Sequence, residues 1–132
     1  MTEKEIATIV VDACVQIHRS LGPGLMESVY ESILADELGA RGLDIQQQVA
    51  VPVVWGHRCH PIAFRIDLLV ENAVVVELKS LDRMAPAHTK QLLTYLRLAD
   101  KRLGLLVNFG MPLARDGIKR VVNNLPEGPE PQ

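Results

Sequence analysis

The stretch VVVELKSL, from Val74 to Leu81, decides how the rest of the chain is interpreted. Its valines and leucines are typical of a buried central strand, yet Glu77 and Lys79 stand inside the run. Because side chains alternate along a strand, Glu77 and Lys79 share one face with Val75, and that face becomes charged toward the end of the strand. The alternative is an exposed charge pair on an edge strand. The apolar flanks favour the buried position.

The preceding strand carries a second carboxylate. HPIAFRIDLLV, residues 60–70, is followed by the short turn ENA at 71–73, which predicts an antiparallel pair with Val74–Leu81. Counting outward from this turn brings Asp67 nearly opposite Glu77. We expect alternation to divide this strand into one face with Phe64, Ile66, Leu68 and Val70, and another with Arg65, Asp67 and Leu69.

Two carboxylates that meet in a partly buried site repel each other unless a cation lies between them. Oxygen ligands with positions left open for water suit Mg²⁺, and Mn²⁺ is an alternative. Lys79 fits the same site, because an ammonium beside a carboxylate-bound metal can stabilise developing negative charge on a phosphate or hold an attacking hydroxide.

The bulk composition predicts one soluble domain. A chain of 132 residues with 48% hydrophobic residues can bury a single core, and no apolar run approaches the roughly 20 residues that cross a bilayer. The start, MTEKEIATIV, lacks the layout of an export signal, so we expect a cytoplasmic protein without membrane contact. Cys14 and Cys59 form no CxxC pair and are interpreted as reduced thiols.

The hydrophobic rhythm predicts the order α-α-β-β-β-α-β in a single domain, residues 1–124, with a disordered tail at 125–132. We expect an amphipathic helix over 3–20 and a second helix with Leu25, Val29, Ile33, Leu34 and Leu38 on one face. A three-strand meander follows, then a helix from about Ala87 to Asp100 and a parallel strand at 103–110. Residues 117–124 fit an edge strand or a short helix equally well.

Charge is divided unevenly along the chain. Residues 1–78 hold 5 Lys+Arg against 11 Asp+Glu, and residues 79–120 hold 9 against 3, which gives −6 and +6 although the whole chain carries −2. A basic half can supply a local phosphate-binding face. The alternative is that these charges only solvate helix faces.

The sequence of features resembles the PD-(D/E)xK nuclease superfamily. An Asp on one strand precedes ExK on the next, a helix and a further strand follow, and GLMESVY (Gly24–Tyr30) reads GxxExxY, as in the small bacterial GxxExxY proteins. The resemblance implies an α/β restriction-endonuclease-like core, with a mixed sheet of four to five strands flanked by helices. Ile66 stands where the superfamily name has proline, which leaves the carboxylate of Asp67 in place.

The resemblance also implies roles for individual residues. Asp67, Glu77 and Glu27 would ligate Mg²⁺ or Mn²⁺, and Lys79 would assist the attacking water. Gln91 would orient Lys79 or a phosphate, and it shares one face of the third helix with His88 and Tyr95. The expected substrate contacts are Tyr30, His88, Lys90, Tyr95 and Arg83, with further phosphate contacts from Arg97, Lys119 and Arg120.

Several of these residues have plainer interpretations. Glu27 could complement the dipole of a first helical turn, Tyr30 could be a core aromatic, and His18 and His88 could be capping or surface histidines. The HRCH stretch, residues 57–60, lacks the paired spacing of a zinc site and is not interpreted as one.

The function favoured by these patterns is a metal-dependent nuclease, a phosphodiesterase that acts on DNA and selects substrate structure rather than sequence, since no base-reading module is present. Action as a homodimer is left open. The alternatives are a catalytically silent nuclease fold that binds nucleic acid or protein, and a hydrolase of some other phosphate ester.

Overall fold

The structure is a computed structural model that describes residues 1–126. Its elements follow the order expected from the sequence: α1 (Glu3–Leu21), α2 (Glu27–Ala40), β1 (Ile45–Trp55), β2 (Arg58–Val70), β3 (Val74–Lys79), α3 (Pro86–Ala99), β4 (Leu103–Asn108), the short 3₁₀ helix η1 (Ala114–Gly117) and β5 (Ile118–Val122). None of the helices within residues 1–126 has the length and apolar character needed to cross a membrane.

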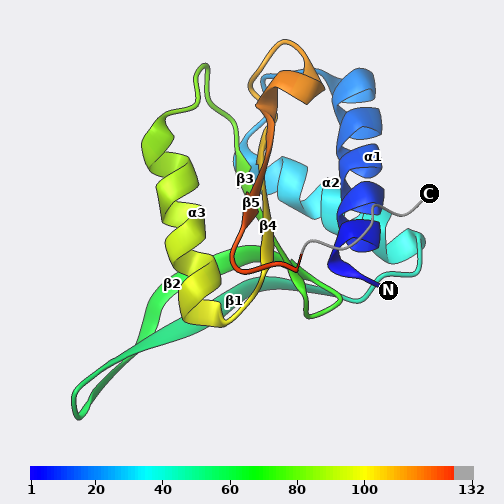
Figure 1. The fold of residues 1–132 in the computed structure, drawn as a ribbon. Helices are drawn as coiled ribbons and strands as arrows, with labels where there is room; N and C mark the ends of the chain where they lie inside the picture. The colour runs from blue at the N-terminus through cyan, green and yellow to red at the C-terminus, as the bar shows by residue number, and fades with distance from the viewer. Residues whose placement is uncertain (127–132) are drawn as a thin grey trace.

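The five strands form one mixed sheet in the order β1-β2-β3-β4-β5. The predicted meander is confirmed, since β1, β2 and β3 pair antiparallel through short turns. The predicted parallel strand is also confirmed: β4 pairs parallel with β3 after α3 crosses over, and β5 adds an antiparallel edge. Helices α1 and α2 cover one face of the sheet and α3 covers the other, which gives an α/β fold (Figure 1).

Of the two alternatives left open for residues 117–124, the edge strand is observed, as β5. A short 3₁₀ turn, η1, leads directly into the edge strand β5. Leu125, assigned to the tail by its sequence, is partly buried and packs against the hydrophobic core. Residues 127–132 of the expected tail lie outside the described residues.

The core has two parts, one on each face of the sheet. The larger lies under α1 and α2, and the smaller lies under α3, where Leu92 and Leu96 pack on Val75 and Leu106. Leu92 packs directly over Gly104, because a Cβ there would lie only 3.1 Å from the leucine. The absence of a side chain at this glycine therefore lets α3 approach the sheet closely.

The apolar face predicted for the second helix is partly wrong. Leu25 and Val29 are exposed, because α2 begins only at Glu27 and turns a different stripe toward the sheet. The residues that α2 buries are Tyr30, Leu34, Ala35 and Leu38.

In both β1 and β2 the alternation of side chains between the two faces of the sheet is interrupted at Gln48 and Asp67, which the sequence analysis did not predict. On β2, Leu68 and Val70 pack under α1 and α2, whereas Phe64 and Ile66 pack under α3. On β1 the same change occurs between Ile45 and Val49. The residue between them, Gln48, has a left-handed backbone with φ of 52°, which breaks the two-residue alternation. The predicted common face of Phe64, Ile66, Leu68 and Val70 is therefore wrong.

Candidate active site

The two predicted acids meet where β2 separates from β3. Backbone pairing of these strands runs from Val70↔Val74 to Leu68↔Val76, and the next residues outward are Asp67 and Glu77. Side chains continue the hydrogen bonding there. Asp67 Oδ2 accepts from the backbone N–H of Leu78 at 2.8 Å, and Glu77 Oε1 accepts from the backbone N–H of Asp67 at 3.4 Å. Each acid is thus held by the backbone beside the other.

Glu77 is a buried carboxyl group with a strongly perturbed pKa. Its side chain is only 7% exposed, and burial, reinforced by the charge of Asp67, raises its pKa from 4.5 to about 8. The hydrogen bond from the Asp67 backbone and the charge of Lys79 act in the opposite direction, while Glu27 raises the pKa further. Such a group is ionised at neutral pH only when extra positive charge lies close by.

Neither carboxylate has a protein counter-ion. Within the described part of the chain, no Lys, Arg or His forms an ion pair with Asp67 or Glu77. A repelling pair of oxygen donors without a protein cation fits a hard divalent ion such as Mg²⁺. Residues 1–126 contain no ready-made group of three His, Cys, Asp or Glu side chains, so the expected third ligand, Glu27, is not gathered with the other two.

Gln48 is a site residue that sequence reasoning missed. It lies opposite Asp67, between the pairs Gln47↔Leu68 and Val49↔Ile66. Its side-chain amide donates to Asp67 Oδ1 at 3.2 Å and to Glu31 Oε1 on α2 at 2.7 Å. Three successive glutamines gave no signal that the last would adopt a left-handed backbone and touch the acid.

The loop that follows Glu77 and Lys79 is fixed by a buried amide. Asn108, 1% exposed at the end of β4, accepts from the backbone N–H groups of Leu81 and Gly110 and donates to the carbonyl of Leu81. The backbone carbonyl of Lys79 accepts from Phe109 at 2.9 Å. Gly110 is required here, since a Cβ would lie 2.3 Å from the Leu81 carbonyl oxygen. The backbone at the half-buried Lys79, the last residue of β3, is therefore held in place by these hydrogen bonds.

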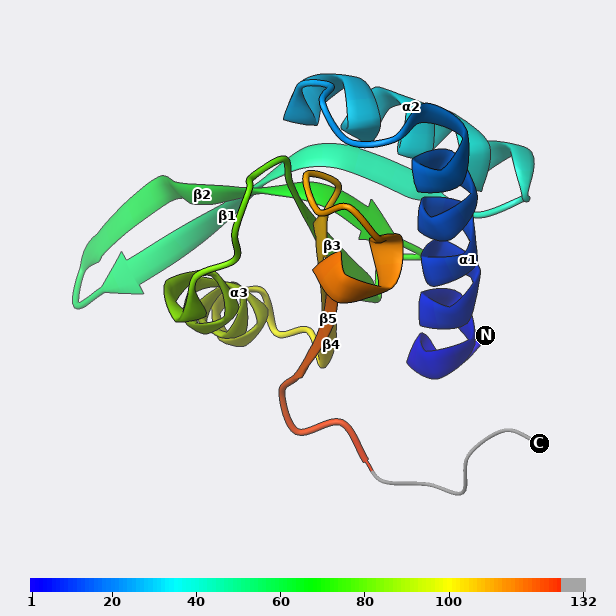
Figure 2. The same cartoon turned by 90° about the horizontal axis from the view of Figure 1, so that it is seen from above.

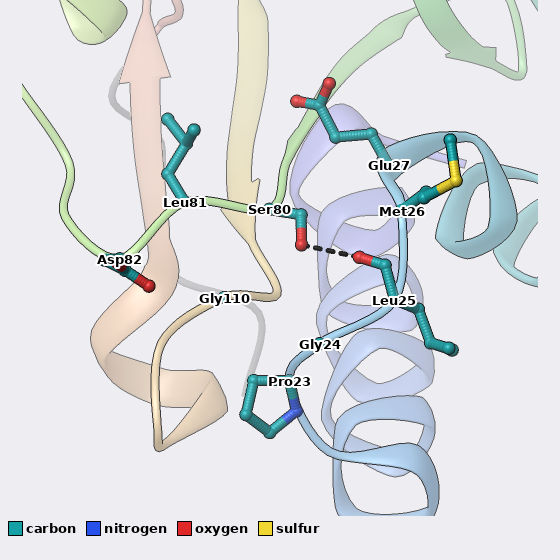
Figure 3. A pocket seen from close by; sticks show the side chains of 9 residues that line it. All are labelled: Pro23, Gly24, Leu25, Met26, Glu27, Ser80, Leu81, Asp82 and Gly110. Atoms are coloured by element: carbon teal, nitrogen blue, oxygen red, sulfur yellow. Dashed lines mark hydrogen bonds between the residues drawn. The ribbon is translucent and has the colours of Figure 1, made fainter.

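A cavity of about 630 Å³ lies next to this loop, between the turn at Pro23–Met26 and residues Ser80–Asp82. The Ser80 hydroxyl donates to the Leu25 carbonyl at 2.7 Å and joins its two walls (Figure 3). Glu27, the first residue of α2, lines the cavity. Its charge raises the pKa of Glu77, although neither Glu77 nor Asp67 lines the cavity itself.

A family model described as the PD-(D/E)XK nuclease superfamily matches residues 4–121, which is most of the chain. The chain belongs to the PD-(D/E)XK nuclease superfamily. No curated protein and no solved structure matches it. The superfamily is one of nucleases, so membership suggests a nuclease-type function with a nucleic acid as substrate, and divalent metals are typical of the superfamily.

One face of helix α3 carries three of the expected site residues, Gln91, His88 and Tyr95. Tyr95 stacks on Phe64 of β2, with ring centroids 3.8 Å apart. Burial raises the pKa of Tyr95, and the charges of Glu77 and Asp67 raise it further, which places its hydroxyl in their field. Gln91, one turn earlier, is exposed at the edge of this face. His88 Nδ1 accepts from the backbone N–H of Ala85, so this histidine caps the helix.

The basic residues expected to bind substrate in this nuclease fold lie on different surfaces. Arg83 is exposed in the loop before α3, whereas Lys90 and Arg97 are exposed on the side of α3 away from its buried leucines. Lys119 pairs with Leu106, which pairs in turn with Glu77, so all three occupy one row of the sheet. Arg120 faces the opposite side of β5.

The GxxExxY stretch has a structural as well as a chemical part. Tyr30 is fully buried, its hydroxyl donates to the Gly22 carbonyl and accepts from the backbone N–H of Leu25, and its ring stacks on Phe109. The expectation that Tyr30 contacts substrate is therefore wrong, because its hydroxyl is used to hold the turn that carries Glu27. His18 is buried as well and bonds the Met111 carbonyl at 2.7 Å.

Proposed function

We propose that this protein is a metal-dependent nuclease that hydrolyses phosphodiester bonds in DNA. One observation carries the proposal: Asp67 and Glu77 converge in a partly buried site without a counter-ion among residues 1–126, and Lys79 follows on the same strand as Glu77. The family match supports it, since the two acids and the lysine occupy the order of the superfamily's name.

Asp67 and Glu77 are the residues that would hold Mg²⁺ or Mn²⁺, because they are hard oxygen donors that repel each other without it. Such an ion, when bound, supplies Lewis-acid polarisation of the phosphate and lowers the pKa of a water molecule. The backbone N–H of Leu78 holds Asp67 and the backbone N–H of Asp67 holds Glu77, which fixes both carboxylates before substrate arrives.

Lys79 is the group that offsets negative charge on the phosphate in the transition state. It is half-buried and close enough to lower the pKa of Glu77, yet it forms no ion pair with either acid. Its ammonium is therefore free to bind a phosphate oxygen. In this proposal Tyr95, which lies in the field of the two acids, and Gln91 act from α3, and Glu27 positions water from α2 with an exposed carboxylate.

Substrate contacts in this proposal are made to phosphates rather than to bases. Arg83, Lys119 and the remaining basic residues of the chain's second half supply positive charge, which attracts phosphates whatever the base sequence. Selectivity for substrate structure follows from this arrangement.

Cleavage of labelled single-stranded, double-stranded, flapped and branched DNA in Mg²⁺ tests the proposal. Asp67→Asn, Glu77→Gln and Lys79→Met should each lower the rate by at least about a hundredfold, as expected when a charged group acts in the transition state. Asp36→Asn is a matched control, because Asp36 is exposed on α2. Cleavage that EDTA does not stop, or equal activity in all variants, overturns the proposal.

A catalytically silent nuclease fold is the second candidate. It is favoured by one observation, namely that three acids are not gathered into a metal-binding group within residues 1–126. If Mg²⁺ and Mn²⁺ do not bind at millimolar concentration while DNA does, this candidate replaces the nuclease.

A further inference from the structure

The ends of β1 and β2 form a hairpin arm, residues 52–63, that leaves the body of the molecule (Figures 1 and 2). Its side chains are largely exposed although many are apolar: Val54 is 67% exposed, Trp55 80% and Ile62 54%. An aromatic ring on a projecting hairpin adds nothing to the core, so a role in binding is the more economical explanation.

The arm is also free of negative charge. No Asp or Glu occurs between Asp44 and Asp67, although the chain has 16 of them, while the arm itself carries Arg58 and two of the four histidines. This composition complements a polyanion.

Register places the aromatic ring and the basic groups together. Trp55 pairs directly with Arg58 next to the turn, and Val53 pairs with His60, so Trp55, Arg58 and His60 lie on one face of the arm. Val51, on the same face of β1, packs in the core under α3, as does Val75 two residues before Glu77. The β1–β2 register shifts between Val51 and Val53, but burial still alternates along β1 through both residues, so this face of the arm continues the face of the sheet that carries Glu77.

We propose that the hairpin arm binds an unpaired strand of the nucleic-acid substrate, with Trp55 stacked on a base and Arg58 and His60 on the neighbouring phosphates. The inference rests on the proposed nuclease function and adds a second contact region to it. Trp55, paired with Arg58, and Gln48, opposite Asp67, are separated by roughly 23 Å along β1 at the usual rise per residue, so the arm holds the strand several nucleotides from the scissile phosphate. Stacking on an aromatic ring tolerates every base, which agrees with selection of structure rather than sequence.

A second copy of this chain is a less suitable occupant of the arm. Two arms packed on each other would bring like charges together. β1 is an edge strand, and Pro52 interrupts its edge because proline has no N–H to donate to an added strand.

Trp55 is the sole tryptophan of the chain, so its fluorescence reports on the arm directly. Titration with a single-stranded oligonucleotide in EDTA, where no cleavage occurs, should quench it in a saturable manner, and a blunt duplex should quench it much less. Trp55→Ala and Arg58→Ala should weaken binding of a labelled single strand, measured by anisotropy, by about tenfold each. Trp55→Phe, which keeps an aromatic ring, should retain most of the affinity that Trp55→Ala loses. Arg19→Ala, an exposed arginine in the last turn of α1, is the charge-matched control.

Unchanged fluorescence together with equal affinity of wild type and Trp55→Ala overturns the inference. So does a dimer in sedimentation velocity that Trp55→Ala converts to monomer without loss of DNA affinity, since the arm would then bind a second copy. Failure of the arm with intact Mg²⁺-dependent cleavage leaves the proposed function standing. Intact arm binding without cleavage removes the nuclease and keeps the arm as a nucleic-acid contact.

Discussion

The backbone N–H of Asp67 donates a hydrogen bond to the buried carboxylate of Glu77, at the residue where β2 stops pairing with β3. The separation of two antiparallel strands thus opens a gap, and two acidic side chains fill it. Backbone groups that a continuing ladder would have used bind the carboxylates instead. The site is therefore a local end of the sheet rather than an insertion into it.

Glu77 makes folding stability depend on pH in the absence of metal. Its pKa is about 8 in the folded protein and 4.5 when unperturbed, so the folded state binds the extra proton in this window. Stability is then full below pH 4.5 and falls as pH rises through 8, by an amount of the order of a few kcal/mol. Thermal melting in EDTA at pH 5.5 and 8.5 measures this effect.

The matched variant is Glu77→Gln, which keeps the shape and removes the charge. It should be more stable than wild type at pH 8.5 and show a flatter pH profile. Mg²⁺ should raise the melting temperature of wild type at pH 8.5 and leave that of the variant unchanged. If the melting temperatures of wild type and Glu77→Gln fell equally between pH 5.5 and 8.5, the pH dependence would not come from Glu77.

Substitutions of Gln48 should change folding stability and cleavage activity in different ways. Its left-handed backbone costs about 1 kcal/mol relative to glycine, and its amide joins Asp67 to Glu31. Gln48→Gly should therefore fold at least as stably as Gln48→Ala and yet lose cleavage activity to the same extent, about tenfold. Urea unfolding and single-turnover cleavage test the two halves. Full activity of Gln48→Gly would show that the amide does not position Asp67.

Of the two named residues of GxxExxY, we expect Tyr30 to affect folding stability and Glu27 to affect cleavage. Tyr30→Phe removes the hydroxyl that binds Gly22 and Leu25, so it should lower the free energy of unfolding by about 1 to 2 kcal/mol and leave cleavage per folded molecule nearly unchanged. Glu27→Gln, at an exposed position, should leave stability unchanged and lower cleavage. The reverse pattern in chemical denaturation and cleavage assays would refute this division.

Asn108 should prove the most sensitive polar residue of the fold. Asn108→Ala leaves the Leu81 backbone groups and the Gly110 N–H without their buried partner, at a cost of about 2 to 4 kcal/mol. Asn108→Asp keeps the acceptor but buries a carboxylate against the Leu81 carbonyl, so its loss should be at least as large. Urea midpoints give the order directly, and equal stability of all three proteins would exclude a structural role for this amide.

Much of the fold could be predicted from the sequence because its elements have strong periodic signals. The run around Glu77 identified the central strand, and the turn after Val70 set the register that places Asp67 opposite it. The inversion of β1 and β2 could not be predicted, since it depends on the backbone angle of one glutamine among three. The structural role of Asn108 could not be predicted either, because a single polar residue at the end of an apolar strand has no periodic signal.

Calorimetric titration of Mn²⁺ into wild-type protein at pH 7, in two buffers with different ionisation enthalpies, tests the metal site most directly. Since Glu77 is largely protonated without an ion, binding should release close to one proton per protein molecule, and Glu77→Gln should bind far more weakly and release none. Absence of any binding heat at millimolar Mn²⁺, or binding that is unchanged in Glu77→Gln, would contradict the claim that Asp67 and Glu77 form a divalent-cation site.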